Sequence, residues 1–219
     1  MQIFLDTANI DQIRQAAELG IISGVTTNPS LLSKESTADY EAVTRQICNI
    51  IDGPVSVEVL SEEADAMVAE ARVKASWGAN VNIKIPATAE GLKAIRTLSE
   101  ENIPTNMTLV FSANQALLGA LAGATYISIF LGRLDDAGHD GMQVVYDTLD
   151  ILDNYPELES QVIAASIRHP LHCTQAALAG ADIGTIPYSV LMQMIQHPLT
   201  DVGIKRFLAD WEKVAKKKR

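Results

Sequence analysis

The sequence alternates, eight times over, between short apolar segments and amphipathic helical patterns. The apolar segments are rich in branched aliphatic residues and are bounded by Pro, Gly or Asn, as is typical of buried strands. They cover residues 2–6, 25–28, 55–60, 81–86, 105–111, 126–131, 162–167 and 183–186. Helical patterns follow at residues 8–19, 37–51, 61–77, from 88 onward, and at 115–122, 142–152, 171–179 and 188–195, whereas residues 133–141 are predicted to form a polar loop.

Regular alternation of strands and helices with short connections predicts a parallel sheet. Eight such units favour a closed (β/α)₈ TIM barrel, and at 219 residues one barrel accounts for the chain as a single α/β domain, residues 1–219. An open doubly wound sheet is the alternative, but the chain lacks the GxGxxG or GxxxxGK[ST] turn that would support it. One amphipathic segment, residues 203–214, is left over and is predicted to form an extra C-terminal helix.

Composition and charge narrow the class of protein. No apolar run approaches the ~20 residues of a membrane helix, and a net charge of −10 argues against a nucleic-acid-binding surface. The first residues show no basic segment ahead of an apolar one, so no signal peptide is predicted. Cys48 and Cys173 lie far apart without metal-ligand spacing, and we expect them to be thiols of a cytoplasmic protein.

Lys84 lies in the middle of the apolar segment at residues 81–86. Lysine is almost never fully buried unless it is paired, and burial disfavours the ammonium form of an amine. A neutral amine can attack a carbonyl group and form a Schiff base. The alternative is that only the aliphatic part of the side chain is buried, while the ammonium group reaches water at the strand end.

Polar residues recur at alternate positions toward the carboxyl ends of the predicted strands, where alternate side chains share one face. In a closed barrel these faces converge at the end where active sites lie. So many buried polar groups would each need a partner, so the pattern predicts a catalytic cavity. The residues are Asp6, which ends the first strand, Glu58, which stands between two valines, and the pairs Thr26 and Asn28, Asn82 and Lys84, Asn106 and Thr108, Ser128 and Phe130, and Ser166 and Arg168.

An amine, two carboxylates and nearby hydroxyl and amide groups suit carbonyl chemistry, because a Schiff-base cycle needs a nucleophile and acid–base groups. Arg133 and Arg168 follow strand ends, where their guanidinium groups are suited to bind a phosphate. Alternatively, Arg133 forms a surface ion pair with one of the aspartates at 135–136. His169 and His172 have no obvious third ligand, so we expect no metal at this pair.

Six motifs, in order along nearly the whole chain, resemble the transaldolases, in particular the short group that also contains the fructose-6-phosphate aldolases. They are FLDTA at residues 4–8, GVTTNPS at 24–30, IKIP at 83–86 with EG at 90–91, NMTLVF at 106–111, SIFLGR at 128–133 and ASIR at 165–168. The resemblance implies a (β/α)₈ barrel that uses no cofactor and acts on sugar phosphates.

The resemblance also implies roles for individual residues. Lys84 would form the Schiff base, and Asp6 would take the proton from the substrate hydroxyl as the carbon–carbon bond breaks. Glu58 and Thr108 would hold the water used to form and hydrolyse the imine. The remaining residues would bind substrate: Asn28 and Asn106 at the dihydroxyacetone unit, Thr26 and Ser128 beside it, and Arg133, Ser166 and Arg168 at the phosphate.

In the implied reaction, dihydroxyacetone would move from sedoheptulose 7-phosphate to glyceraldehyde 3-phosphate, giving erythrose 4-phosphate and fructose 6-phosphate. Two positions favour this transfer over the aldolase branch of the group. The aldolases typically carry glutamine and tyrosine where this chain has Glu58 and Phe130. A tyrosine hydroxyl could protonate the enamine and release dihydroxyacetone, whereas the phenyl ring of Phe130 has no proton to give.

Two alternatives stay open. One is a fructose-6-phosphate aldolase of the same family. The other is a sugar-phosphate-binding barrel without activity, although such a chain would be expected to have lost Lys84, Asp6 or Glu58. A departure from the family pattern, Ile129 where many members have proline, points outward by alternation and casts little doubt on the resemblance.

The resemblance bears on assembly as well. Members of the short group tend to form rings of five subunits, often doubled, in which an extra C-terminal helix takes part. Leu208, Trp211 and Val214 in the predicted last helix suit such a docking role. We therefore expect a homo-oligomer, a pentamer or a decamer.

Overall fold

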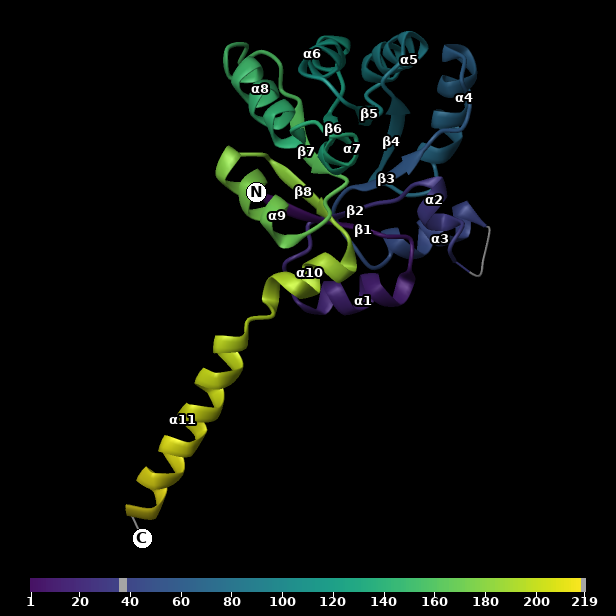
Figure 1. Ribbon diagram of the computed structural model, residues 1–219. Coiled ribbons are helices and arrows are strands. Elements are labelled where there is room, and N and C mark those ends of the chain that lie inside the picture. Colours follow the sequence, from purple (N-terminus) through teal and green to yellow (C-terminus); the bar gives the residue numbers. More distant parts are fainter. Residues whose placement is uncertain (36–38, 218–219) are drawn as a thin grey trace.

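The computed structural model describes residues 1–35 and 39–217 and contains a closed barrel of parallel strands in the order of the chain (Figure 1). Each strand pairs with its neighbours in sequence, and β1 pairs with β8 to close the barrel. The predicted (β/α)₈ barrel is therefore confirmed. The strands are β1 Gln2–Asp6, β2 Gly24–Thr26, β3 Val55–Glu58, β4 Val81–Pro86, β5 Thr105–Val110, β6 Tyr126–Phe130, β7 Gln161–Ala165 and β8 Ile183–Ile186.

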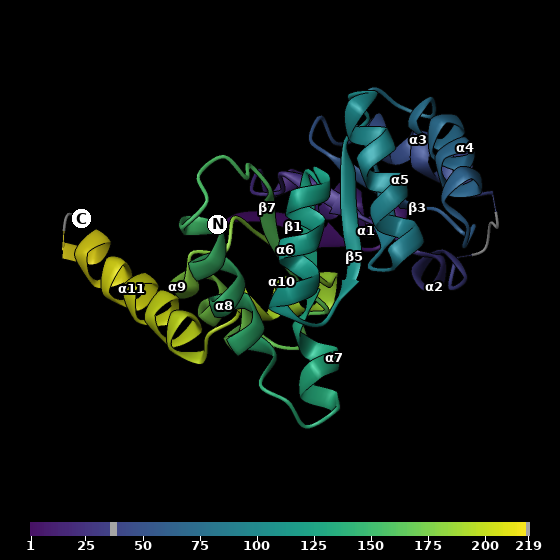
Figure 2. The same cartoon turned by 90° about the horizontal axis from the view of Figure 1, so that it is seen from above.

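Helices surround the barrel, as Figure 2 shows from above. Several begin where the sequence places a capping side chain, whose oxygen accepts an otherwise unpaired main-chain N–H. Asn9 caps α1, Thr88 caps α5 and Ser112 caps α6. The helices are α1 Ile10–Glu18, α2 Pro29–Leu32, α3 Tyr40–Cys48, α4 Ala64–Ala75, α5 Ala89–Glu100, α6 Ala113–Ala122, α7 Leu131–Asp136, α8 Gly141–Asp153, α9 Pro170–Ala179, α10 Tyr188–Ile195 and α11 Pro198–Lys217.

The main hydrophobic core lies between the strands and the surrounding helices, and it contains fully buried residues such as Leu5, Val25 and Ile83. A second, smaller cluster consists of Phe4, Ile163, Ala165 and Ile183, from β1, β7 and β8. Alternation along β1 places Leu5 in the first cluster and its neighbour Phe4 in the second. Because Asp6 follows at the same parity as Phe4, its carboxylate lies on the same face as the smaller cluster.

The strand register brings the predicted polar residues into line across the sheet. Asp6 lies opposite Thr26 in the β1–β2 pair. Glu58 lies opposite Lys84 in the β3–β4 pair, and Lys84 lies opposite Asn106 in the β4–β5 pair. Because adjacent strands are about 4.8 Å apart, this register sets an amine beside a carboxylate without any loop contribution.

Two of the predicted strands, β2 and β7, end two residues earlier than expected, which corrects the placement of some site residues. β2 ends at Thr26, and Asn28 is instead the N-cap of α2, with Pro29 at the first helical position. β7 ends at Ala165, because Ser166 adopts a left-handed backbone conformation with φ of 60°. Asn28, Ser166 and Arg168 therefore lie beyond the strand ends, not on alternating strand faces.

The fifth strand is irregular. Its register with β6 shifts between Met107 and Val110, and Leu109 has a φ of 58°. Such a bulge interrupts the alternation of side chains. The register with β4 stays regular through Thr108, which lies opposite Pro86, so the alternation of Asn106 and Thr108 is kept and the irregularity falls at Leu109.

The predicted polar loop at residues 133–141 is wrong in its first part, because α7 occupies Leu131–Asp136 directly after β6. Six residues are too few for a helical period to be recognised, and Phe130 at its start makes no side-chain cap. The helix predicted over residues 37–51 begins at Tyr40, and Thr37 lies outside the described residues.

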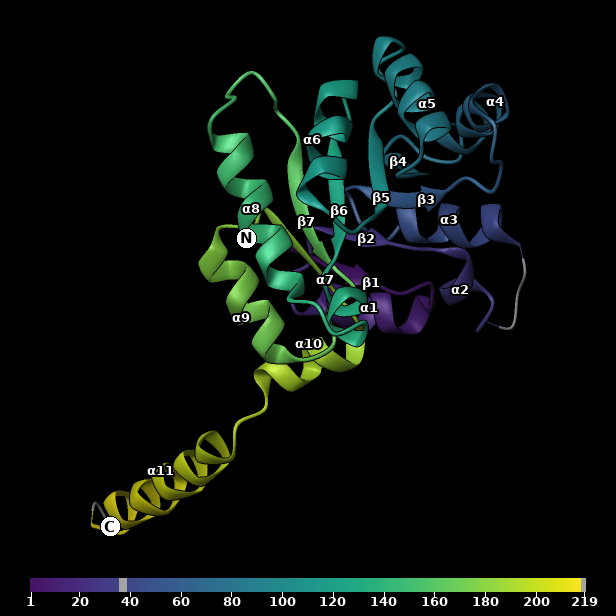
Figure 3. The same ribbon diagram turned by 45° about the horizontal axis from the view of Figure 1, so that its top comes forward.

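The extra C-terminal helix is confirmed and is longer than expected, since α11 runs from Pro198 to Lys217. It extends away from the barrel (Figures 1 and 3). Its apolar side chains are exposed, including Phe207 at 74% and Trp211 at 68%. None of the described helices is long and apolar enough to cross a membrane.

Candidate functional site

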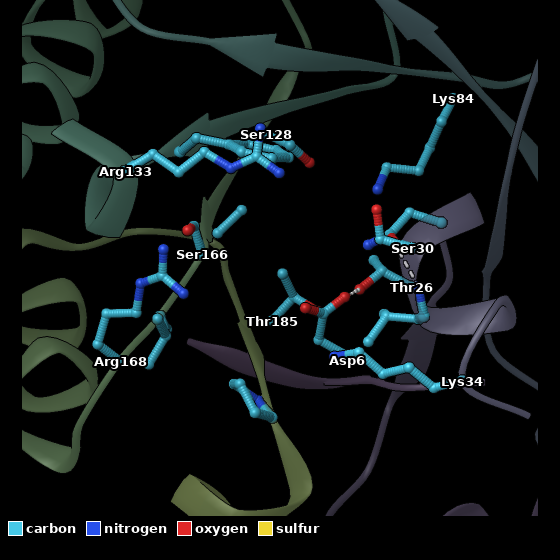
Figure 4. A pocket seen from close by; sticks show the side chains of 16 residues that line it. Asp6, Thr26, Ser30, Lys34, Lys84, Ser128, Arg133, Ser166, Arg168 and Thr185 are labelled. Carbon is cyan, nitrogen blue, oxygen red and sulfur yellow. Dashed lines mark hydrogen bonds between the residues drawn. The ribbon is translucent and has the colours of Figure 1, made fainter. Parts of the chain in front are cut away.

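A cavity of about 220 Å³ opens at the carboxyl ends of the strands. This volume is below the range of about 300–1,000 Å³ that is usual for larger ligands, so it suits a small substrate. Figure 4 shows Lys84 entering from one side, with Arg133, Ser166 and Arg168 on the opposite side. The predicted site residues that line it are Asp6, Thr26, Asn28, Lys84, Ser128, Phe130, Arg133, Ser166 and Arg168.

Lys84 is buried, with only 4% of its side chain exposed. Its Nζ donates a hydrogen bond to the main-chain oxygen of Thr27 at 3.2 Å and lies 3.8 Å from Oε2 of Glu58. The ring of Phe130 lies 6.0 Å away, measured from Nζ to the ring centre. The ammonium group thus does not reach bulk water at the strand end, which was the alternative interpretation of this lysine.

The carboxylate of Glu58 lies beside the amine of Lys84, but Glu58 is not among the residues that line the cavity. Burial raises the pKa of the Glu58 carboxyl above its ordinary value, and Lys84, Arg133 and Lys74 oppose the rise. The main chain of Glu58 is held at both ends. Its N–H donates to the hydroxyl of Tyr40 at 3.0 Å, and its carbonyl accepts from Nζ of Lys74 at 2.7 Å.

Asp6 lies at the bottom of the cavity as drawn in Figure 4 and is held by a short chain of hydroxyl groups. The Thr26 hydroxyl donates to Oδ1 of Asp6 at 2.8 Å. Because that hydroxyl has one proton, its 2.5 Å contact with Oγ1 of Thr185 has Thr185 as the donor. Burial raises the pKa of Asp6, although Lys84 and the hydrogen bond from Thr26 oppose this. An ionised Asp6 is therefore a stronger base than an ordinary aspartate.

The side of the barrel interior next to Lys84 is a connected polar network. Ser128 donates to Oδ1 of Asn106 at 2.7 Å, and Nδ2 of Asn106 donates to Ser56 at 3.1 Å. Ser56 in turn donates to Oδ1 of Asn82 at 2.8 Å. The side-chain amide of Asn106 is thus held at both ends, which fixes its orientation beside Lys84.

Thr108 lies on β5 opposite Pro86 of β4, two residues along the strand pair from Asn106 and Lys84. It is fully buried and does not line the cavity. Its hydroxyl has no hydrogen-bond partner among the described residues. It directly precedes Leu109, where β5 is irregular.

The rim opposite Lys84 is formed by α7 and by the segment after β7. The guanidinium of Arg133 lies 5.0 Å from the ring centre of Phe130, a cation–π contact. Arg168 forms an ion pair with Asp136, with 2.6 Å between Nη2 and Oδ2. The surface ion pair considered for Arg133 is therefore made by Arg168 instead. Gly132 lets the two segments meet, because a Cβ there would overlap the Ser166 carbonyl.

A histidine and an aspartate fix the main chain at Arg168. The Arg168 N–H donates to Nδ1 of His172 at 3.2 Å, and Nε2 of His172 lies 2.9 Å from Oδ2 of Asp135. Burial and the neighbouring His169 lower the pKa of His172, against the pull of Asp135. A neutral ring with its proton on Nε2 satisfies both contacts. Within residues 1–35 and 39–217, no group of three or more His, Cys, Asp or Glu side chains could hold a metal ion.

Further residues of the site were not predicted. Thr185, Ser30 and Lys34 also line the cavity, and Thr27 offers the carbonyl to Lys84. Alternation could have found Thr185, which stands two residues after the buried Ile183 as the polar side chain of the last strand. No strand or helix pattern marks Lys34, which follows the short helix α2.

The fold and the position of the cavity place the protein in the class of (β/α)₈ barrels with a site at the carboxyl ends of the strands. The chain matches the family model described as Transaldolase/Fructose-6-phosphate aldolase over residues 3–218. It is 63% identical over 217 residues to a probable transaldolase of Desulforudis audaxviator and 60% identical over 217 residues to one of Dehalococcoides mccartyi. Both matches cover 99% of this chain and 100% of the relative. The chain therefore belongs to the transaldolase/fructose-6-phosphate aldolase family, which is a family of enzymes.

A solved structure of a protein with a different name has a similar fold. A thiamine phosphate pyrophosphorylase from Pyrococcus furiosus matches with a TM-score of 0.59 and 14% sequence identity, covering 85% of each chain. At this identity the likeness shows the fold alone. The family membership confirms the resemblance expected from the six motifs.

Proposed function

We propose that the protein is a transaldolase that forms a Schiff base on Lys84 and moves a dihydroxyacetone unit between sugar phosphates. The observation that carries this proposal is the setting of Lys84, whose amine is buried in a small cavity with Glu58 at 3.8 Å and faces two arginines. A buried amine beside carboxylates suits imine chemistry, and guanidinium groups suit a phosphate.

In the proposed cycle, the deprotonated amine of Lys84 attacks the ketone carbon of sedoheptulose 7-phosphate, and loss of water from the carbinolamine gives an imine. Glu58 and Thr108 hold this water. Asp6 then accepts the proton of the hydroxyl on carbon 4 as the bond between carbons 3 and 4 breaks, and erythrose 4-phosphate leaves. The remaining electron pair forms an enamine with the nitrogen of Lys84.

The second half of the cycle reverses these steps on another aldehyde. The enamine attacks the carbonyl carbon of glyceraldehyde 3-phosphate, and Asp6 returns its proton to the new hydroxyl group. Water then hydrolyses the imine and releases fructose 6-phosphate. Residues in fixed positions orient the substrate: Asn28, Asn106, Thr26 and Ser128 at the dihydroxyacetone unit, and Arg133, Ser166 and Arg168 at the phosphate.

Phe130 supports transfer over release. Its ring lines the cavity, and the ring centre is 6.0 Å from Nζ of Lys84 and 5.0 Å from the guanidinium of Arg133. The ring excludes water and donates no proton, so the enamine persists until an aldehyde arrives. Glu58 in its ionised form only accepts hydrogen bonds, so it supplies no proton either.

Two measurements test the proposal. Borohydride treatment with fructose 6-phosphate should add mass to the peptide that contains Lys84, and an adduct on Lys93 or Lys34 would refute the assignment. Free dihydroxyacetone should form slowly from fructose 6-phosphate alone, whereas adding erythrose 4-phosphate as the acceptor should give sedoheptulose 7-phosphate rapidly, and Phe130→Tyr should raise the release of dihydroxyacetone at the expense of transfer. If the native protein releases dihydroxyacetone as fast as it transfers it, the protein is an aldolase.

We also propose that the protein acts in the cytoplasm as a homo-oligomer, a pentamer or decamer, of single-domain subunits spanning residues 1–219. Support for the assembly comes from α11, whose exposed apolar residues include Leu208 at 62% and Trp211 at 68%. Exposed apolar surface of this extent is typical of an interface. Sedimentation of the native protein and of Trp211→Glu should give the ring mass and a smaller species respectively, and a monomeric native protein would refute this.

A further inference from the structure

A second buried lysine, Lys74 on α4, lies outside the cavity and has no part in the cycle above. Only 6% of Lys74 is exposed. Its Nζ donates to the carbonyl of Glu58 at 2.7 Å and pairs with Oε1 of Glu70 at 2.9 Å. It also lies over the rings of Tyr40, at 4.8 Å from the centre, and Trp77, at 5.5 Å.

Lys74 bonds the Glu58 carbonyl because β2 ends too early to do so. In a parallel strand, the N–H and C=O of one residue point to the same neighbouring strand, and those of the next residue point to the strand on the other side. The N–H of Val59 points to β4, where it donates to the Lys84 carbonyl at 3.1 Å. The N–H and C=O of Glu58 therefore point to β2. The β2–β3 ladder includes Thr27 N–H to the Ser56 carbonyl at 3.1 Å.

Continuing that ladder would give the Glu58 N–H to the Thr27 carbonyl and the Glu58 carbonyl to the nitrogen of residue 29. Residue 29 is proline and has no N–H. The chain also turns into α2 here, since Asn28 is its N-cap. The helices α3 and α4 lie near β3 (Figure 3). One side chain from each supplies the missing partners.

Tyr40 replaces the acceptor and Lys74 replaces the donor. The Tyr40 hydroxyl accepts from the Glu58 N–H at 3.0 Å. It lies 2.9 Å from the Thr27 hydroxyl, which donates to the Ser56 carbonyl at 2.8 Å, so the proton between the two hydroxyls comes from Tyr40. Burial raises the pKa of Tyr40 to about 12, so the hydroxyl keeps its proton.

Because the Glu58 N–H donates to Tyr40, it does not donate to the Thr27 carbonyl. That carbonyl accepts instead from Nζ of Lys84 at 3.2 Å. We propose that Lys74 and Tyr40 are positioning residues for the reaction. They hold the main chain of Glu58 in place of a longer β2, and they thereby fix the Glu58 carboxylate and the Thr27 carbonyl on either side of Lys84. The inference rests on the proposed roles of Lys84 and Glu58.

Glu70 completes the arrangement one turn before Lys74. Its carboxylate accepts from the N–H of Leu60 at 3.0 Å and of Ser61 at 2.9 Å, in addition to the ion pair with Lys74. The end of β3 and the segment just after it are therefore held at Glu58, Leu60 and Ser61 by two side chains of one helix turn.

The test compares kcat and KM of three variants in the full-length protein. Tyr40→Phe deletes one hydroxyl and keeps the ring that Lys74 covers, and Lys74→Met deletes the donor. Each should lower kcat roughly tenfold, because small displacements of reacting groups are costly, and should leave KM for fructose 6-phosphate within about twofold. Lys74→Arg, which keeps a donor and a positive charge, should restore kcat to within about threefold of native.

Arg72→Met is the matched control, because it removes a positive charge from the exposed side of the same helix. It should leave both constants unchanged. A native kcat in Tyr40→Phe overturns the inference, and this variant decides if Lys74→Met does not fold. A loss of activity that follows only the fraction of folded protein also overturns it. Absence of borohydride trapping in the native protein is a different result and refutes the proposed function itself.

Discussion

The two sides of the barrel mouth are built in different ways. On one side, Asp6, Glu58 and Lys84 are carried by strands β1, β3 and β4, so the sheet register fixes their positions. On the other side, Arg133 lies on α7 and Arg168 follows the end of β7. Figure 4 shows these arginines across the cavity from Lys84. The proposed reacting groups thus belong to the strands, and the proposed phosphate ligands to segments beyond them.

Burial and partners differ in the same way. The side chain of Lys84 is 4% exposed, and its hydrogen-bond acceptor is a main-chain carbonyl. The side chain of Arg168 is 47% exposed, and its partner Asp136 is 62% exposed. An exposed ion pair contributes only about 0–1 kcal/mol, so a phosphate can displace Asp136 at small cost. Fixed groups therefore suit the bond-making steps, and exchangeable partners suit repeated binding and release of phosphates.

The largest effect is expected at Lys84. Lys84→Met should lower transfer activity by at least about a thousandfold, the scale of loss when a covalent nucleophile is removed, and should abolish borohydride trapping. Lys93→Met is the control, since Lys93 is an exposed lysine on α5 that pairs with Glu90. If the activity of Lys84→Met is within tenfold of the control, Lys84 is not the nucleophile. The strand side of the cavity would then not be the side that carries the reacting groups.

Asp6→Asn should lower kcat by about 10²–10⁴-fold, the usual contribution of a general acid–base group. In the native protein kcat should rise with pH on the acidic side, because the ionised form is the base. Since burial raises the pKa of Asp6, that rise should lie above the ordinary aspartate value of about 3.9. The pH profile of kcat measures this. Glu58→Gln should keep the rise, and its loss in that variant would assign it to Glu58 instead.

The strand side of the mouth was the more predictable from sequence. Lys84 and Glu58 interrupt apolar segments, and strand alternation alone places them on the polar face. The neighbouring-strand register then follows from the order of the barrel. The network that supports them was not predictable in this way, because the contacts of Glu58 with Tyr40 and Lys74 depend on where β2 ends and on how two helices pack.

The rim was less predictable because it depends on local backbone geometry. The left-handed conformation of Ser166 ends β7 two residues before its predicted end, and serine gives no sign of it in the sequence. The six-residue helix α7 is too short to show a period, so its start was expected to be a loop. The ion pair of Arg168 with Asp136 joins two segments 32 residues apart and could not be chosen over Arg133 from sequence.

A smaller effect is expected at the rim. Arg168→Ala should raise KM for phosphorylated sugars by roughly ten- to a hundredfold, because charge-assisted hydrogen bonds contribute about 1.5–3 kcal/mol each. Unphosphorylated ketoses should be little affected. Steady-state kinetics on fructose 6-phosphate and on fructose or dihydroxyacetone would measure this, and equal losses on both types would show that Arg168 does not bind phosphate.

A second variant, Asp136→Ala, also tests whether Arg168 binds phosphate. It removes the resting partner of Arg168, so KM for phosphorylated sugars should fall slightly or stay the same. A rise in KM as large as that of Arg168→Ala would show that Asp136 orients the guanidinium and does not compete with the phosphate.

The smallest effect on kcat is expected at Thr185, at the end of the hydroxyl chain that reaches Asp6 through Thr26. Thr185→Val keeps the shape of the side chain and removes a hydrogen bond worth about 0.5–1.5 kcal/mol, so kcat should fall about two- to tenfold. KM for fructose 6-phosphate should stay constant, because Thr185 holds the strand side of the mouth and not the rim.

Thr105→Val is the matched control, since Thr105 is equally buried and its hydroxyl has no partner within the described chain. If both valine variants lower kcat equally, the hydroxyl chain does not position Asp6. If Thr185→Val changes KM and leaves kcat intact, the two sides of the mouth are not separate in function.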